Sequence, residues 1–354
     1  AASVFCGVYY GVSASLLLIV ILLAIRRPNR FYRSGSTPFH GIRRNWNEEP
    51  FYLPEQFGGK YLSNDFFGGN FRGITEKMDY IASLGTTILY LNPISKSFSS
   101  HRYDTGDYKT PDPMLGTVGD FKAMCDAAHA RGIRVVLDGV YSHTGSDSLY
   151  FNRNKTFDGV GAYNSQQSPF YSWYTFHSWP NCYNSWWGFD ILPNVNETNP
   201  QYMEYITGEG GIIEKWLKLG ADGWRLDVAD ELPDEFIEAI HTRAKATKKD
   251  AIVLGEVWED ASNKVAYSHR RKYLLGHELD SVMNYPFANA IIDFVADNDA
   301  AFFLDKILTI YFTKAHFNYS DQPKVQVEIN DPLGQKRSAK EIVETYSAIL
   351  PEDN

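Results

Sequence analysis

One unit recurs along the chain from about residue 70: an amphipathic helix ends near a glycine, and a short apolar run rich in strand-forming residues follows. In the first unit, Ile74, Met78 and Ile81 share a helix face, Gly85 follows the helix, and residues 86–92 form the apolar run. Further predicted strands follow helical segments at 133–137, 223–226 and 252–254. A helical period that gives way to a continuous apolar run is typical of parallel strands covered by helices.

This repetition leaves two architectures open. Helix–strand repetition without a dinucleotide-binding fingerprint favours either a (β/α)8 TIM barrel or a doubly wound α/β sheet. More than 80 residues separate the predicted strands at 133–137 and 223–226, and this stretch contains four of the eight tryptophans. Because so long a loop inside a domain is usually functional or a small inserted domain, we predict a loop-rich insertion at this point.

Each of three successive predicted strands ends in a carboxylate, namely Asp138, Asp227 and Glu256. The C-terminal ends of parallel barrel strands open onto one face, so we expect these carboxylates around one cleft. A single acid at a strand end could simply cap the following helix. Three of them, beside Arg225 and His143, favour a functional site instead.

Two carboxylates at one cleft suit retaining hydrolysis of a glycosidic bond, in which one attacks the anomeric carbon and the other protonates the leaving oxygen. Arg225 lies two residues before Asp227, so both side chains point to the same side of a strand, and the cation is expected to lower the pKa of Asp227. The acid must keep its proton, and apolar neighbours favour this; Val257 and Trp258 follow Glu256.

Several segments resemble signature segments of glycoside hydrolase family 13, the α-amylase superfamily. They read HRYDTGDY, DGVYSHTG, GWRLDVADE and VLGEVWED, and the nearest likeness is to the neopullulanase and cyclomaltodextrinase subgroup. The resemblance covers roughly residues 66–311. It implies a TIM-barrel catalytic domain and a retaining hydrolase of α-glucans such as maltodextrin, cyclodextrin, pullulan or starch, which acts by double displacement.

The resemblance also implies roles for residues at the cleavage point. Asp227 is similar to the family's nucleophile and Glu256 to its general acid/base. His143 and Arg225 resemble groups that bind the sugar at the cleavage point, and Tyr103 resembles the aromatic platform on which that sugar stacks. From the residues alone, His143 could also be a buried, hydrogen-bonded histidine and Tyr103 an ordinary core residue.

Further residues are assigned to the support of the site or to the leaving-group side. By resemblance, Asp138 supports the site, and Asp230 and Glu231 lie near the leaving group. Trp258, beside the predicted acid, belongs to the same substrate-binding set. Asp230 could instead be the N-cap of the helix that begins at Pro233.

Two departures from the family pattern affect these expectations. The family's third carboxylate lies in an Asn-x-x-x-x-His-Asp segment after the seventh strand, and no such segment follows Tyr311. The last helix–strand units are not recognisable either, so we expect an incomplete barrel. Ser142 stands where many members have an asparagine that helps bind calcium. We therefore predict no required cofactor and no metal ligand, with calcium left open.

These departures keep two alternatives to hydrolysis open. One is a non-catalytic amylase-like protein, either a sugar binder or a transporter heavy chain, because the third carboxylate segment is missing. The other is an α-glucan transglycosylase. An α-glucan is the expected binding partner in most of these cases, and a homodimer is left open.

The N-terminal segment carries a separate prediction. Residues 1–25 contain no charged side chain, and four arginines follow, at Arg26, Arg27, Arg30 and Arg33. This pattern suits a membrane anchor that would hold the rest in the cytoplasm. A buried element of the fold, or an altered beginning of the chain, are the alternatives. We divide the chain at the following residues: 1–30, apolar segment; 31–139, first part of the barrel; 140–200, insertion; 201–311, second part of the barrel; 312–354, atypical tail.

Composition excludes one class of partner. The net charge of −9 argues against nucleic acid, which requires a basic face. Three cysteines at wide spacing form no disulfide framework or zinc site, and free thiols in a reducing compartment are the simpler interpretation.

Overall fold

The computed structural model describes residues 69–261 without a break and most of residues 264–286. Outside these it describes only short pieces, which are 8–11, 14–19, 43–44, 49, 52–53, 60–61, 66–67, 288–289, 292, 328–330 and 336–338.

A seven-stranded sheet forms the centre of the described structure, in the order β1-β2-β7-β10-β13-β14-β17. Its strands are β1 (Val8–Gly11), β2 (Ala14–Ile19), β7 (Ile88–Leu91), β10 (Arg134–Gly139), β13 (Gly223–Leu226), β14 (Ile252–Gly255) and β17 (Ser281–Val282). Strand β1 pairs antiparallel with β2. The other neighbouring strands of this sheet pair in parallel, and their order across the sheet follows their order along the chain. Parallel strands in sequence order are the arrangement of a TIM barrel, which is incomplete among the described residues.

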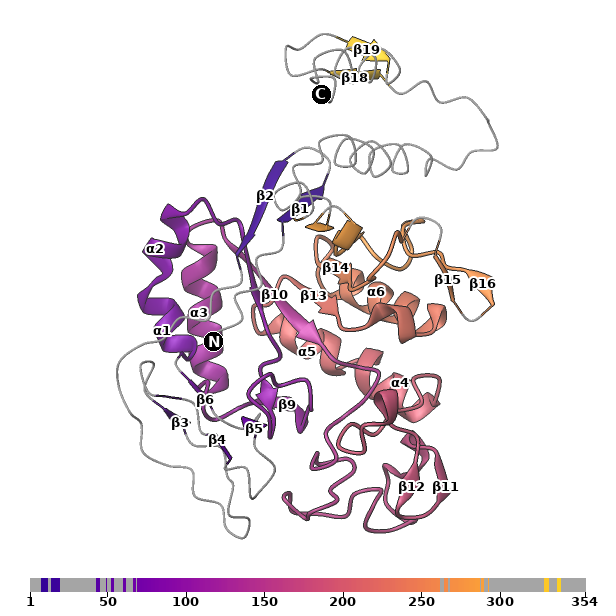
Figure 1. Cartoon of the computed structure of the whole chain (residues 1–354). Coiled ribbons are helices and arrows are strands. Elements are labelled where there is room, and N and C mark those ends of the chain that lie inside the picture. The colour runs from indigo at the N-terminus through magenta and orange to yellow at the C-terminus, as the bar shows by residue number, and fades with distance from the viewer. Residues whose placement is uncertain are drawn as a thin grey trace, which may run out of the picture.

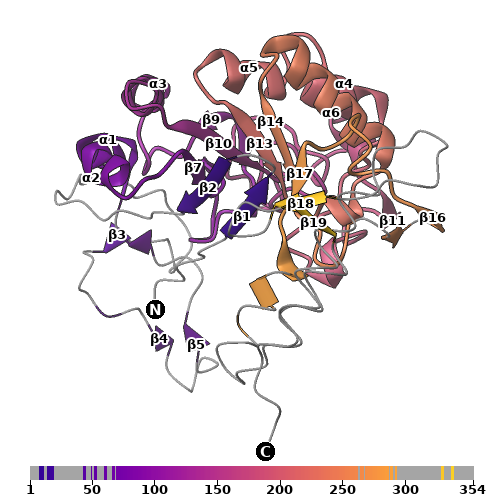
Figure 2. The ribbon, with the colours of Figure 1, turned by 90° about the horizontal axis from the view of Figure 1, so that it is seen from above.

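Within the described part of the chain, six α-helices are defined, and they lie outside these strands. They are α1 (Phe71–Glu76), α2 (Met78–Ser83), α3 (Val118–His129), α4 (Pro200–Thr207), α5 (Ile212–Lys218) and α6 (Asp234–Thr247). Figure 1 shows α1 to α3 to the left of the strands and α4 to α6 at their centre and right, and Figure 2 shows the helices as one arc around the strands. Thr117 and Asp120 form a capping box that begins α3.

The core explains why the strands are apolar throughout. Leu89 and Val135 face the helices in the larger hydrophobic cluster, whereas Ile88, Tyr90 and Val136 form a second cluster on the other side of the sheet. Every residue of β7 and β13 is buried, as expected for strands covered on both faces. The predicted strands at 86–92, 133–137, 223–226 and 252–254 correspond to β7, β10, β13 and β14, with Asp138 inside β10 rather than after it.

The predicted insertion contains only short elements. They are the 3-10 turns η2 (Tyr171–Trp173) and η3 (Trp186–Gly188) and the hairpin β11 (Phe176–Ser178) with β12 (Cys182–Tyr183). Isolated bridges from His143 to Asn194 and from Tyr174 to Val195 tie the two ends of this segment together. The boundaries of the five predicted segments stay predictions.

The remaining short elements pair locally. The 3-10 turn η4 (Ala229–Glu231) follows β13. The two-stranded ladders are β3 (Arg43–Arg44) with β6 (Phe66–Phe67), β4 (Tyr52–Leu53) with β5 (Lys60–Tyr61), β8 (Ser95–Lys96) with β9 (Asp107–Pro111), β15 (Val265–Ala266) with β16 (His269–Arg270), and β18 (Glu328–Asn330) with β19 (Lys336–Ser338). The tail predicted to differ from the helix–strand unit, 312–354, is described only at β18 and β19.

The apolar N-terminal segment contains a strand. Within it, β2 pairs in parallel with β7, at Leu18 opposite Ile88. At these residues the strand agrees with the alternative that the apolar segment is an element of the fold. Most of residues 1–30 lie outside the described residues. None of the described helices combines the length and apolar character that crossing a membrane requires.

A substitution at Gly223 would show how tightly β13 packs against β14. A Cβ there would lie 2.3 Å from Ile252 O in the neighbouring strand β14. We expect Gly223→Ala to lower the free energy of unfolding by about 1–3 kcal/mol, as overpacking does. Gly119→Ala is the control, because its Cβ in α3 would meet nothing closer than 3.5 Å. There alanine should stabilise by about 0.5–1 kcal/mol. Urea unfolding measures both, and equal midpoints for the two variants would contradict the packing described.

Candidate active site

Arg225 contacts all three strand-end carboxylates. Its Nη1 donates to Asp138 Oδ1 and to Asp227 Oδ1, both at 2.8 Å, and its Nη2 lies 2.7 Å from Glu256 Oε2. Sheet register explains this meeting, since Arg225 pairs with Asp138 in β10 on one side and with Leu254 in β14 on the other. The structure therefore brings together the carboxylates expected around one cleft, and one guanidinium joins them.

Asp138 is held by two phenols in addition to the arginine. Tyr90 and Tyr103 both donate to its Oδ2, the second at 3.0 Å. Burial raises the pKa of Asp138, although Arg225 and these hydrogen bonds oppose the shift. All three contacts point at a carboxyl group that is itself buried, which fits the expectation of a supporting role.

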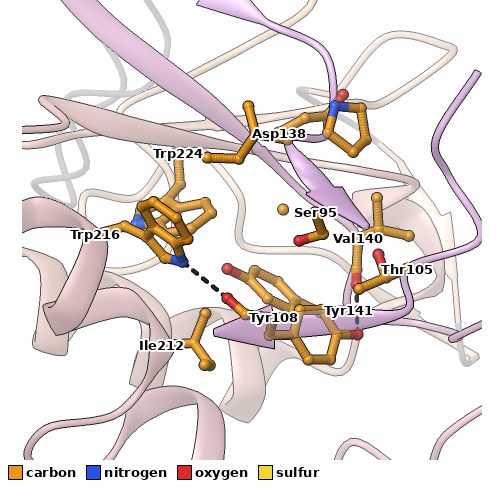
Figure 3. Close-up of a pocket in the computed structure, with 12 residues that line it drawn as sticks. Ser95, Thr105, Tyr108, Asp138, Val140, Tyr141, Ile212, Trp216 and Trp224 are labelled. Atoms are coloured by element: carbon orange, nitrogen blue, oxygen red, sulfur yellow. Dashed lines mark hydrogen bonds between the residues drawn. The ribbon is translucent and has the colours of Figure 1, made fainter. Parts of the chain in front are cut away.

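A small internal cavity adjoins Asp138 at the ends of β10 and β13 (Figure 3). Its lining includes Tyr141, Trp216 and Trp224, and all three are buried. Tyr141 Oη and Trp224 Nε1 have no hydrogen-bond partner among the residues that the structure describes. Because buried polar groups are normally bonded, we expect a water molecule there rather than a sugar.

Asp227 follows β13 and is buried. Burial raises its pKa well above the ordinary value, and the charges of Asp138 and Glu256 add to the shift, whereas Arg225 opposes it. The expectation that Arg225 would lower the pKa of Asp227 is therefore wrong in its net direction. The arginine acts as expected, but it is shared among three carboxylates and does not outweigh the loss of water.

Glu256 has polar rather than apolar surroundings. Burial raises its pKa, but Arg225 and hydrogen bonds from the Val228 N–H, Trp258 and Tyr285 outweigh burial, so the pKa is lowered. The Val228 nitrogen and the Tyr285 hydroxyl both donate at 2.9 Å. The prediction from sequence neighbours is thus wrong, because these donors come from other loops and face the charge in space.

The backbone at Val228 is strained. This β-branched residue has φ 44° and ψ 52°, a left-handed conformation that such residues rarely adopt. The turn aims its N–H at Glu256 Oε2. Strain of this kind concentrates at functional sites.

His143 and Tyr103 form one hydrogen-bonded unit. His143 Nε2 lies 3.1 Å from Tyr103 O and its Nδ1 lies 3.0 Å from Ser142 Oγ. Burial lowers the pKa of His143 to about 4, so near neutral pH the ring is neutral, donates from Nε2 and accepts at Nδ1. Tyr103 is only half-buried and reaches Asp138, so it is not an ordinary core residue. The sugar-binding roles of both stay predictions.

The residues that the sequence analysis assigned to the leaving-group side lie in η4 and close after Glu256. Asp230 accepts from the Tyr273 hydroxyl at 3.1 Å and lies 3.3 Å from Lys264 Nζ. Its interpretation as an N-cap is wrong, because Pro233 occupies the N-cap of α6. Glu231 Oε1 accepts from the Trp187 indole at 2.9 Å.

Sequence reasoning missed Tyr90, Tyr285 and Trp187. A tyrosine inside an otherwise apolar strand signals that its hydroxyl has a buried partner, so Tyr90 could have been found. Tyr285 lies beyond the recognisable motifs, and no local pattern indicates that it reaches Glu256.

Calcium beside His143 stays an open prediction from the sequence. Among the described residues, no group of three or more His, Cys, Asp or Glu side chains could hold a metal. Ser142, which stands at the family's asparagine position, is buried, and its hydroxyl is 3.0 Å from His143 Nδ1.

The raised pKa of Asp227 makes its charge a cost to stability. The folded chain holds the Asp227 proton more tightly than the unfolded chain does. The stability that this proton contributes is therefore fully present at low pH and is lost as the pH rises through the folded pKa. Asp227→Asn should therefore raise the Tm at pH 7 by a few degrees, since roughly 1 kcal/mol shifts the Tm by about 2–4 °C. The gain should shrink toward pH 4. Exposed Asp79, whose pKa Arg131 lowers, is the control, and Asp79→Asn should show no gain. Calorimetric scans across pH measure this, and a constant gain would contradict it.

Comparisons with known proteins identify the family of this chain. The family description "Alpha amylase, catalytic domain" matches residues 27–328. An amylopullulanase of Thermoanaerobacterium saccharolyticum is 38% identical over 303 residues, which are 76% of this chain and 23% of that protein. A cyclomaltodextrinase of Thermoanaerobacter pseudethanolicus is 36% identical over 68% of this chain and 40% of its own length.

Solved structures of similar proteins indicate the same family. The ligand-free cyclic alpha-maltosyl-(1→6)-maltose hydrolase of Arthrobacter globiformis superposes with a TM-score of 0.63 at 27% identity, over 76% of this chain and 56% of that one. The chain thus spans less than a quarter of the first curated relative and about half of this structural neighbour. The expected likeness to cyclomaltodextrinases and neopullulanases is confirmed. This chain belongs to the α-amylase catalytic-domain family of glycoside hydrolases, family 13.

Proposed function

We propose that the chain carries out retaining hydrolysis of α-glucans, with Asp227 as nucleophile and Glu256 as general acid/base. The observation that carries the proposal is that the Arg225 guanidinium contacts both carboxylates, so both lie at one point on the strand ends. Relatives named for pullulan and cyclomaltodextrin support an α-glucan substrate. A cytoplasmic location and a homodimer stay predictions from the sequence.

The reaction proceeds in two displacements. Asp227 Oδ attacks the anomeric carbon, the bond from this carbon to the leaving oxygen breaks, and Glu256 gives that oxygen a proton. Glu256, now a carboxylate, then takes a proton from water, and this water attacks the glycosyl–Asp227 ester from the other side. The ester bond breaks, the sugar leaves with its original anomeric configuration, and both carboxyl groups regain their starting states.

The starting protonation requires a rearrangement. In the structure, Glu256 is stabilised as a carboxylate, and Asp227 tends to keep a proton. A sugar bound against Asp227 would draw Glu256 away from Arg225. Loss of this contact removes the strongest stabilisation of the Glu256 charge, so its pKa rises, and one proton of the cluster moves from Asp227 to Glu256.

The remaining groups orient the sugar. We assign Tyr103 and His143 to the sugar at the cleavage point, Asp138 to support of Arg225, and Asp230, Glu231 and Trp258 to the leaving-group side. The sequence after Tyr311 lacks the His-Asp segment whose carboxylate holds sugar hydroxyls in the family. For this reason, sugar binding and turnover are measured separately below.

Two variants separate the two acid roles. Asp227→Asn should lose at least about 10³-fold in turnover of both maltohexaose and α-glucosyl fluoride, because both require the nucleophile. Glu256→Gln should lose maltohexaose turnover but still release a first equivalent of fluoride from α-glucosyl fluoride, since fluoride leaves without a proton, after which the glycosyl–Asp227 ester persists because the second step lacks its base. Release of reducing sugar and of fluoride ion measures the two.

Calorimetry with maltohexaose completes the test. Binding without turnover by the wild-type chain would indicate a sugar binder, and maltohexaose that is lengthened rather than shortened would indicate a transglycosylase. Equal turnover by Asp227→Asn and the wild-type chain would refute the assignment of the nucleophile.

A further inference from the structure

A strip of exposed aromatic side chains borders the site. Trp187 in η3 is 65% exposed, Phe189 just after it is 54% exposed, and Trp258 beyond Glu256 is 39% exposed. Large apolar side chains at such exposure are unusual when several lie together, and they mark binding surfaces.

Trp187 is held in place by three contacts. Its ring stacks on Trp186 with centroids 5.1 Å apart and meets the Trp258 ring edge-on at 5.7 Å. Its indole N–H donates to Glu231 Oε1 at 2.9 Å. The side chain is therefore exposed and fixed at the same time, which lowers the entropy cost of binding a ligand to it.

The backbone at Trp187 has an unfavourable conformation. With φ 50° and ψ 25° it is left-handed, which bulky residues seldom adopt. Gly188 follows with φ 81°. Strained conformations persist only where surrounding contacts enforce them, and they cluster at ligand-binding sites.

Each contact of Trp187 leads to a residue of the proposed active site. Glu231 lies four residues after Asp227, and Trp258 donates a hydrogen bond that lowers the pKa of Glu256. Trp186 packs against His143 with ring centroids 5.6 Å apart. Trp187 consequently lies beside the acid/base, on the side assigned to the leaving group.

We propose that Trp187 is the stacking platform for a glucose unit on the leaving-group side of the cleaved bond, which makes it a specificity-determining residue for oligomeric glucans. The inference rests on the proposed function and extends it to a residue of the insertion. The C–H face of a pyranose ring is apolar and matches a rigid indole face, whereas its hydroxyl rim requires polar neighbours such as Glu231. An α-glucan chain that enters the cleft meets this surface directly.

The test compares two substrates that differ in whether sugar occupies the leaving-group side. In α-glucosyl fluoride no sugar occupies that side, whereas maltohexaose places glucose units there. We expect Trp187→Ala to lower kcat/KM for maltohexaose about tenfold, mainly through KM, as loss of an aromatic contact would. Turnover of α-glucosyl fluoride should stay unchanged. Trp187→Phe, which keeps an aromatic face but loses the bond to Glu231, should fall in between.

Controls distinguish failure of this inference from failure of the proposed function. Tyr80→Ala removes an aromatic side chain that is 55% exposed on α2 and should alter neither substrate. Unchanged maltohexaose kinetics in Trp187→Ala, or an equal loss on both substrates, overturns the inference alone. If the wild-type chain binds maltohexaose in calorimetry without turnover, the tenfold loss is expected in Kd. A wild-type chain that neither binds nor turns over either sugar overturns the proposed function and this inference with it.

Discussion

The structure depends on one buried cation that faces three buried carboxylates. Arg225 contacts Asp138, Asp227 and Glu256, and all four side chains are buried. One positive charge cannot compensate three negative ones away from water, so the cluster retains protons, and the raised pKa values of Asp138 and Asp227 express this. Parallel register fixes the cluster, because β10, β13 and β14 end at the same edge and Arg225 is on the central strand.

Sequence reasoning succeeded where the relevant neighbours are set by the strand pattern. Continuous apolar runs located β7, β10, β13 and β14, and a carboxylate after each of the last three predicted strands located the cluster. It failed on the protonation of Asp227 and Glu256. Burial decides the direction for Asp227, whereas for Glu256 Arg225 on the neighbouring strand and hydrogen bonds that include those from Val228 and Tyr285 outweigh burial. Residue spacing carries no information about such contacts.

Stability and chemistry conflict at this edge of the sheet. The fold accepts a left-handed valine next to the predicted nucleophile, a buried aspartic acid whose ionisation is costly, and a left-handed tryptophan on the surface. Each of these features opposes stability, and each belongs to the network of contacts around Glu256. Local rules of sequence design are usually broken where function requires it, so their coincidence here is itself evidence for the site.

The division between strands and loops also explains how close relatives can differ in substrate. The family match at residues 27–328 includes Arg225, Asp227 and Glu256, and proteins named amylopullulanase and cyclomaltodextrinase match 76% and 68% of this chain. If the strand ends supply the same chemistry in all of them, the choice of glucan must come from the surrounding loops, which carry specificity in barrels generally. In this chain the insertion places Trp187 in contact with Trp258 and Glu231, so a loop residue determines what lies next to a strand-borne acid.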